Sequence, residues 1–303
     1  MGCSQGKTNE GEREKLEKER NRFPTCRKNI TLTKKVDSVA VHDSNQVFLG
    51  AKDELQLLDL KTDNIITFST EHKGRINVLI KMNDGRIASG GQDKTIKVWN
   101  IDSKESVMTL EGHTSMIWAL NEISGNKLIS GGSDKRALIW DLNQKKLDFE
   151  LYKDKEISVV LYLKNGNVLI CSENTLILFD LNSKEKLSSI EIPTGIWAIK
   201  ELHDGTVAIG KGNGEICILN IGREITIKMT LVGHKKSVNS IIELDNHKLV
   251  TAADEFNMIL WNLNDPDAKY FIEGHTKNVT CVAHLVGNKF VSVSTDQTLK
   301  IWE

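Results

Sequence analysis

Short hydrophobic runs separated by polar turn residues follow one another along most of the chain. Runs such as NKLISGG and KRALIWDL are rich in aliphatic and β-branched residues, with Gly, Asp, Lys and Ser between them. Such runs are typical of short strands joined by tight turns. Within them, no apolar stripe with helical spacing extends over the roughly 11 residues that identify an amphipathic helix. The pattern therefore predicts an all-β architecture.

The runs repeat with a period near forty residues. Each unit carries a large apolar side chain near its end, and these positions lie 39 to 42 residues apart. They are Leu58, Trp99, Trp140, Phe179, Leu219, Trp261 and Trp302. Four short strands fit a unit of this length, so the spacing predicts seven similar sheets.

A second pattern accompanies the tryptophan in four of the units. A histidine precedes the tryptophan by 27 residues, a hydroxyl residue follows the histidine by 17, and an acid follows the hydroxyl by four. The four sets are His72, Ser89, Asp93 and Trp99; His113, Ser130, Asp134 and Trp140; His234, Thr251, Glu255 and Trp261; and His275, Ser292, Asp296 and Trp302. In the third set Asp254 is a second candidate for the acid.

The Gly-His pairs, turn acids and Trp-Asp or Trp-Asn pairs resemble the WD-repeat family of β-propellers. The resemblance covers about residues 29–303 and implies a seven-bladed propeller of four-stranded antiparallel sheets. Residues 1–28 would form a separate charged tail. The resemblance also implies that each set forms one hydrogen-bonded chain inside a blade. Units one, four and five lack the histidine, which leaves their local geometry open but not their number.

A Ser-His-Asp grouping also suggests a hydrolase triad. A catalytic triad occurs once per site, whereas this set recurs four times at the same spacing and includes a tryptophan. The structural interpretation is therefore preferred. We predict no enzymatic activity, no cofactor, no metal and no small-molecule substrate.

The resemblance implies that the seventh unit reaches only the third strand of a blade before Glu303. An unpaired strand edge invites aggregation, so a further strand is expected to cover it. The β-rich run NITLTK at residues 29–34 aligns with the outer strands of other units. We expect this run to complete the seventh blade and join the two ends of the propeller.

Composition narrows the function classes. The chain has 40 basic and 41 acidic residues, and this balance argues against a general nucleic-acid binder. No apolar run is long enough to span a bilayer, and no secretory signal is recognisable. The cysteines, Cys3, Cys26, Cys171, Cys217 and Cys281, are scattered, which favours a reducing, cytoplasmic location and argues against structural zinc.

The first residues, MGCSQGK, resemble an N-myristoylation signal with Gly2 as the acceptor. A single myristoyl chain binds membranes weakly, and Cys3 is the candidate for a second, palmitoyl anchor. This pair predicts a tether to the cytosolic face of a membrane. The alternative is a coincidental match in a solvated tail.

Propellers of this family use the narrower face around the central channel to grip peptides. The position after the first apolar residue of each inner strand would line this mouth, which gives Asp37, Asn77, Trp118, Ser158, Trp197, Asn239 and Thr280. Trp118 and Trp197 stand at otherwise polar positions, and aromatic residues are enriched at interface hot spots. The alternative is that each indole folds back onto its own blade.

The sequence therefore predicts a protein-interaction scaffold that presents a propeller face to peptide segments of other proteins. The alternative is a structural subunit of a large cytoskeletal, ciliary or ribosome-associated assembly, with the blade sides as contact surface. A repeat fold of this kind does not by itself identify the partners.

Overall fold

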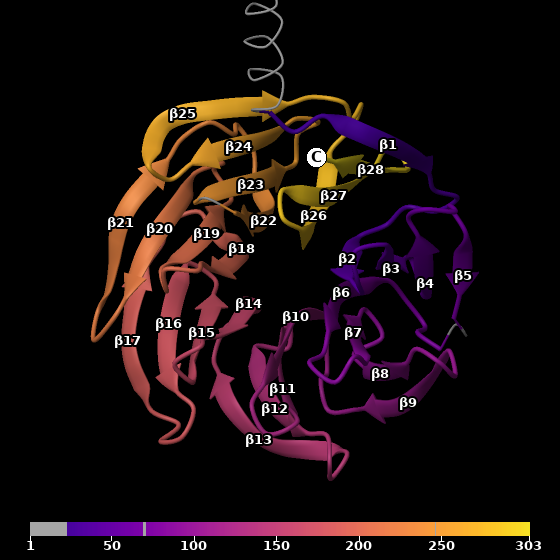
Figure 1. The fold of residues 1–303 in the computed structure, drawn as a ribbon. Coiled ribbons are helices and arrows are strands. Elements are labelled where there is room, and N and C mark those ends of the chain that lie inside the picture. Colours follow the sequence, from indigo (N-terminus) through magenta and orange to yellow (C-terminus); the bar gives the residue numbers. More distant parts are fainter. Residues whose placement is uncertain (1–22, 69–70, 246) are drawn as a thin grey trace, which may run out of the picture.

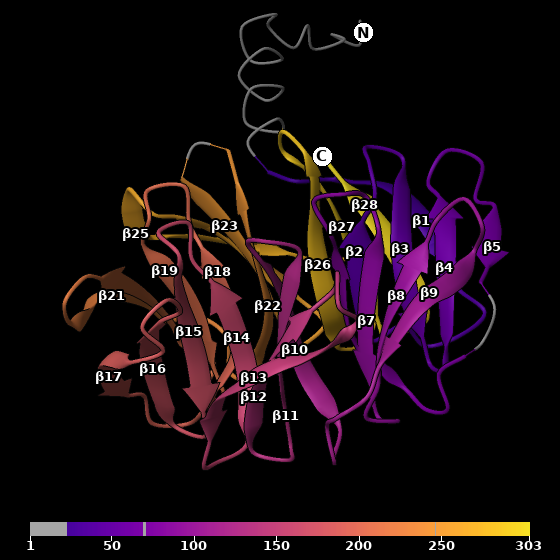
Figure 2. The ribbon, with the colours of Figure 1, turned by 90° about the horizontal axis from the view of Figure 1, so that it is seen from below.

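The computed structural model describes residues 23–68, 71–245 and 247–303, and every regular element in these ranges is a β-strand. The strands form seven four-stranded antiparallel sheets, which stand as blades around a central axis (Figure 1). Viewed at right angles to Figure 1, the inner strands run between the two faces of the ring (Figure 2). The predicted all-β, seven-bladed architecture is confirmed. The described residues contain no helix that could cross a membrane.

In each of the first six blades the chain runs from the innermost strand to the outermost. Blades 1 to 3 contain β2 (Ser38–Val41), β3 (Gln46–Ala51), β4 (Glu54–Asp59) and β5 (Ile65–Thr67); β6 (Ile76–Lys81), β7 (Ile87–Gly91), β8 (Ile96–Asn100) and β9 (Glu105–Leu110); and β10 (Ile117–Ile123), β11 (Lys127–Gly132), β12 (Arg136–Asp141) and β13 (Lys146–Lys153). Blades 4 to 6 contain β14 (Ile157–Tyr162), β15 (Asn167–Ser172), β16 (Thr175–Asp180) and β17 (Lys186–Glu191); β18 (Ile196–Glu201), β19 (Val207–Lys211), β20 (Ile216–Ile221) and β21 (Ile225–Leu231); and β22 (Val238–Leu244), β23 (Lys248–Ala253), β24 (Met258–Asn262) and β25 (Asp265–Ile272). Blade 7 contains β26 (Val279–Val286), β27 (Lys289–Ser294), β28 (Thr298–Trp302) and β1 (Cys26–Thr31).

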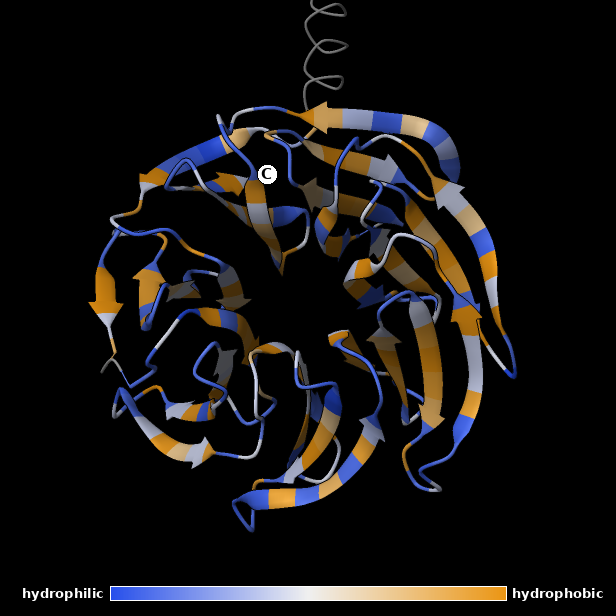
Figure 3. Cartoon of the chain, turned by 180° about the vertical axis from the view of Figure 1, so that it is seen from behind, coloured by the Kyte–Doolittle hydropathy of each residue, from blue (hydrophilic) through white to orange (hydrophobic). Residues whose placement is uncertain are grey.

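The hydrophobic pattern of each strand reflects its distance from the axis. The two middle strands of a blade have consecutive buried residues, as in β11 and β12, because neighbouring blades cover both faces of the sheet. The outermost strand β13 instead alternates exposed and half-buried residues. Hydrophobic colour accordingly concentrates on the strands, and hydrophilic colour on the turns (Figure 3).

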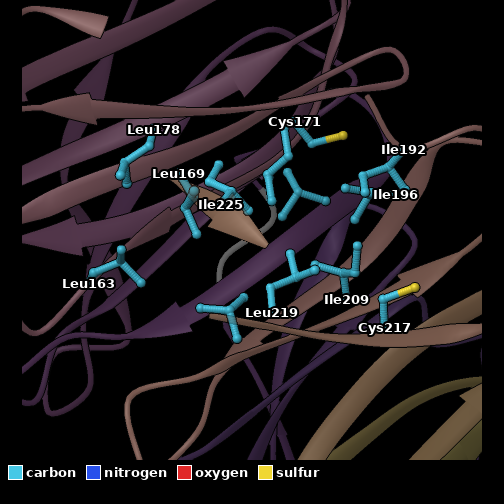
Figure 4. Packing of buried hydrophobic residues seen from close by; sticks show 13 residues of the cluster. Leu163, Leu169, Cys171, Leu178, Ile192, Ile196, Ile209, Cys217, Leu219 and Ile225 are labelled. Carbon is cyan, nitrogen blue, oxygen red and sulfur yellow. The ribbon is translucent and has the colours of Figure 1, made fainter. Parts of the chain in front are cut away.

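The core lies between adjacent blades. Between blades 4 and 5, Leu169 and Leu178 pack with Ile209 and Leu219 in one buried cluster (Figure 4). Leu58, Phe179 and Leu219, which replace tryptophan, are all buried. A blade therefore forms without the histidine-containing set, because burial of an aliphatic or phenyl side chain at this position still supplies the hydrophobic contact.

Strand β1 closes the ring. It pairs antiparallel with β28, from Cys26 opposite Trp302 to Thr31 opposite Thr298. Backbone bonds of 2.9 and 3.1 Å also join Thr25 and Glu303 in both directions. The predicted closure is confirmed, but the strand lies three residues earlier than the expected run 29–34. Its pairing ends at Thr31 because β28 begins opposite that residue.

Candidate functional site

The four predicted side-chain sets meet inside their blades. In blade 2, Ser89 Oγ accepts a hydrogen bond of 2.8 Å from the indole N–H of Trp99 and lies 2.7 Å from His72 Nε2. The other ring nitrogen, His72 Nδ1, lies 2.8 Å from Asp93 Oδ2. The sets in blades 3 and 7 have the same contacts at 2.7 to 2.9 Å.

The carboxylate determines the direction of these bonds. A carboxylate only accepts, so Nδ1 of the histidine donates to it, Nε2 accepts from the serine hydroxyl, and that hydroxyl accepts from the indole. Burial lowers the pKa of His113 and of His275 by more than their acidic partners raise it, which keeps both rings neutral. Burial alone would raise the pKa of Asp93, but the hydrogen bonds that its carboxylate accepts from His72 and from two backbone N–H groups hold it well below its usual range.

Blade 6 departs from this geometry. Thr251 Oγ1 takes the place of serine, 2.8 Å from both Trp261 Nε1 and His234 Nε2. Of the two candidate acids, Glu255 faces the histidine, but its Oε2 lies 3.6 Å from His234 Nδ1, and that nitrogen is buried without a hydrogen bond. Asp254 instead accepts from Asn239 Nδ2. The longer glutamate side chain therefore holds its histidine less closely than aspartate does.

The glycine before the histidine is explained by its close packing against the tryptophan ring of the same blade. A Cβ added to Gly112, Gly233 or Gly274 would lie 2.7 to 3.0 Å from the tryptophan ring of the same blade. Glu71 replaces this glycine in blade 2, where it contacts Lys97 Nζ at 3.4 Å and accepts from Ser106 Oγ.

The buried sets cannot act as catalytic triads. The hydroxyl residues are fully buried and the histidines are 4 to 6% exposed, so no substrate reaches them. Their contribution is to the stability of each blade, since a polar network stabilises when every member is paired.

The seven predicted mouth residues line one hollow of about 750 Å³ at one end of the channel. In six blades the residue is the one skipped in the pairing of the inner strand with its neighbour. Such a β-bulge turns a side chain away from the regular alternation of a strand. These bulged residues are Asn77, Trp118, Ser158, Trp197, Asn239 and Thr280. Asp37 immediately precedes β2.

Three of the polar mouth residues join adjacent blades. Asn77 Nδ2 donates to the carbonyl of Ile117 at 2.9 Å, and Ser158 Oγ donates to that of Ile196 at 2.8 Å. Thr280 Oγ1 donates to the carbonyl of Val36 at 3.1 Å. These bonds link blade 2 to 3, 4 to 5 and 7 to 1, so they hold the rim of the hollow in a fixed shape.

The two indoles of the mouth rest on their own blades by one edge. Trp118 Nε1 donates to Ser133 Oγ at 2.8 Å. Trp197 Nε1 lies over Gly212, where an added Cβ would be 3.3 Å away. The residues are nevertheless 40% and 57% exposed. Each indole is therefore anchored at one edge, while much of its ring stays open to the hollow.

The hollow includes residues that the sequence analysis missed. They come from loops and turns, where no strand pattern indicates direction: Arg75, Ser133, Glu156, Glu173, Asn174 and Thr194. Arg75 Nε lies 3.1 Å from Asp37, so a guanidinium group reaches the mouth from outside the seven predicted positions.

A second repeated contact, between a glutamate carboxylate and a backbone N–H, lies toward the other end of the inner strands. Glu122, Glu201 and Glu243 each follow a mouth residue by four positions. Each accepts a backbone N–H from the preceding blade, those of Asn83, Lys164 and His203, at 2.7 to 3.1 Å. The constant spacing of four residues after a mouth position is the sequence feature that marks this contact.

Comparison with known proteins agrees with this geometry. The family model "WD domain, G-beta repeat" matches residues 63–100, 104–141 and 267–303. The three matched segments cover the first three strands of blades 2, 3 and 7, each together with all or most of the outer strand of the preceding blade. The chain thus carries three recognised WD repeats within a seven-bladed β-propeller. WD-repeat propellers generally act as non-enzymatic scaffolds for protein interactions.

The relatives of this WD-repeat chain are longer proteins. Apoptotic protease-activating factor 1 of Rattus norvegicus is 23% identical over 275 residues, covering 86% of this chain and 21% of that protein. The p21-activated protein kinase-interacting protein 1-like of Danio rerio is 27% identical over 232 residues, 74% of this chain and 63% of that protein. Mitochondrial division protein 1 of Saccharomyces cerevisiae is 35% identical over 178 residues, 54% of this chain and 25% of that protein. The chain spans less than two thirds of each.

The predicted lipidation residues Gly2 and Cys3 lie outside the described residues. Among the residues that the structure does describe, no group of three or more His, Cys, Asp or Glu side chains is placed to bind a metal ion.

Proposed function

We propose that this WD-repeat protein is a non-enzymatic scaffold that binds peptide segments of other proteins at the mouth defined above. The observation that carries the proposal is the pair of exposed indoles, Trp118 and Trp197, on the rim of a hollow. Large aromatic side chains contribute strongly to binding when a partner covers them. Cross-blade hydrogen bonds hold the rim, so little ordering is needed on binding.

The double variant Trp118→Ala/Trp197→Ala tests this proposal. Truncation of a hot-spot aromatic weakens binding by about 2 kcal/mol or more, so the variant should lose at least tenfold in affinity for proteins that the intact chain captures. The four buried histidine-containing sets lie elsewhere, so the melting temperature should change little. The measurement is quantitative affinity capture, followed by titration of each captured protein.

A matched control variant tests whether partners bind to the sides of the blades instead of the mouth. Ile227 and Phe271 lie on the outermost strands of blades 5 and 6 and are 50% and 53% exposed. The double variant Ile227→Ala/Phe271→Ala removes similar exposed apolar surface away from the mouth. It should retain the partners. Loss of partners in this variant, with retention in the mouth variant, would favour the structural-subunit alternative.

We also propose that acylation of Gly2 and Cys3 attaches this scaffold to the cytosolic face of a membrane. The support is the sequence MGC and the need for two lipid chains in stable anchoring. Mass spectrometry of the native N-terminus and fractionation of a Gly2→Ala variant test the tether. An unmodified Gly2 would refute it.

A further inference from the structure

Blade 4 lies between the two blades that carry the exposed indoles. Trp118 is on β10 of blade 3, and Trp197 is on β18 of blade 5 (Figure 1). Blade 4 lacks the histidine-containing set, and its loops contribute Glu156, Glu173 and Asn174 to the hollow. Two aromatic side chains therefore flank a wall that carries two carboxylates.

The charges on this wall are not balanced. Lys155 Nζ pairs with Glu173 at 2.9 Å. Glu156 is exposed and forms no ion pair within 4 Å among the described residues. The blade 4 wall of the hollow, with its ion-pair partner, thus carries one uncompensated negative charge.

The wall on the other side of the opening has the opposite sign. Lys35 Nζ and Arg75 Nε both lie 3.1 Å from the carboxylate of Asp37, so two cations share one anion. A cationic ligand would be repelled from this wall and attracted to blade 4. An acidic group would have the opposite preference.

We propose that the blade 4 side of the mouth binds an arginine side chain of the partner segment, with its guanidinium between Trp118 and Trp197 and directed toward Glu156. The chemistry is that of a cation over the faces of aromatic rings, strengthened by a carboxylate that accepts from the guanidinium. Arginine is preferred over lysine because its planar group both stacks on an indole and forms paired hydrogen bonds. The inference rests on the proposed function and adds the chemistry of the partner.

The test uses defined probes and the full chain. The probe is the pentapeptide acetyl-Gly-Gly-Arg-Gly-Gly-amide, compared with versions that carry citrulline, lysine or glutamate at the centre. Citrulline has nearly the same shape as arginine without its charge. The readout is the nuclear magnetic resonance signal of the indole N–H groups in protein labelled with nitrogen-15. Single Trp118→Phe and Trp197→Phe variants assign the two signals.

The arginine peptide should shift the signals of Trp118 and Trp197 at millimolar concentration, and the lysine peptide should do so more weakly. The citrulline and glutamate peptides should leave both in place. Glu156→Gln should weaken arginine binding by about two- to fivefold. Glu105→Gln, at an exposed carboxylate on the outer strand β9, should not change it. Added salt should weaken binding, because the site is open to solvent.

Fluorescence quenching provides a measurement without any peptide. The other four tryptophans are 1% exposed, so external quenchers reach mainly Trp118 and Trp197. A negative wall concentrates cations, so caesium should quench more efficiently, relative to iodide, in the wild type than in Glu156→Gln. An equal ratio in the two proteins would overturn the assigned charge.

Equal shifts with the arginine and citrulline peptides, or no shift with the arginine peptide, would overturn the inference. Failure of the proposed function gives a different result. If the Trp118→Ala/Trp197→Ala variant retains all captured partners while the arginine peptide still binds, the mouth is not the partner site. If the variant loses the partners while the arginine peptide does not bind, the mouth recognises another chemistry.

Discussion

A single hydroxyl oxygen connects each buried tryptophan to its histidine. In blade 3, Ser130 Oγ accepts from Trp140 Nε1 at 2.8 Å and lies 2.7 Å from His113 Nε2. Removing this oxygen would leave a buried indole N–H and a buried ring nitrogen without partners. A buried polar group without a hydrogen bond is more costly than the net gain from making one.

Ser130→Ala is therefore expected to lower the free energy of unfolding by about 2–4 kcal/mol, since two buried groups each lose a partner at roughly 1–3 kcal/mol. Ser130→Thr is the matched control, because Thr251 performs the same role in blade 6. Urea denaturation measures both variants. An alanine variant as stable as the threonine variant would show that the bonds contribute little.

The buried histidines predict a dependence of stability on pH. Burial lowers the pKa of His113 and His275 in the folded protein, whereas unfolded histidines bind a proton near pH 6.5. Below that pH the unfolded chain binds more protons, so the free energy of unfolding should fall as the pH drops from about 6.5 toward the folded-state pKa. Each histidine contributes at most about 1.4 kcal/mol per pH unit.

Urea titrations at pH 7.5, 6.5 and 5.5 measure this effect. The slope should be smaller in His113→Gln, which removes one buried imidazole. A stability that rises on acidification in this range, or a slope unchanged in the variant, would contradict the explanation.

At the scale of the strand and blade, the repeat tolerates exchange of the polar set for apolar packing. Blades 4 and 5 have no such set, yet Phe179 and Leu219 occupy buried positions equivalent to the tryptophans. What the blades share is the burial of both faces of their middle strands. The hydrophobic period therefore determines the number of blades, and the histidine-containing sets stabilise individual blades.

The β-bulge of the inner strand is the element that forms the candidate site. It occurs at the same place in six blades and brings one side chain per blade to the mouth. In three blades that side chain bonds to the next blade, and in two it is an exposed indole. The same β-bulge thus places side chains that join neighbouring blades and side chains that would contact a partner.

At the scale of the whole molecule, closure joins two segments far apart in the sequence. Ile30 of β1 is 5% exposed and lies opposite Leu299 of β28. A closed ring has no unpaired gap between its first and last blades, so the contacts of β1 support the entire structure.

Ile30→Ala is expected to lower the free energy of unfolding by about 2–4 kcal/mol through loss of buried surface and formation of a cavity. The melting temperature should fall by roughly 5–10 °C. Asn29→Ala, at the exposed neighbouring position, should change the free energy by less than about 0.5 kcal/mol. Thermal denaturation monitored by circular dichroism measures both variants, and equal melting temperatures would argue against the closure as a source of stability.

The sequence by itself determined the number of blades, the four polar sets and the ring of mouth positions. Each of these depends on spacing within a repeat of about 40 residues, and copies of a repeat fold alike. It also indicated a closing strand, although three residues away from its observed place, because only pairing with β28 defines where β1 begins and ends.

Only the tertiary structure decided which groups share the hollow. Glu156, Glu173 and Arg75 lie on loops and turns, and their positions follow from how the blades pack around the axis. The looser contact of Glu255 with His234 likewise depends on side-chain geometry that spacing does not specify. Local periodicity determines the repeating unit, whereas the distance between side chains of different blades depends on the closed ring as a whole.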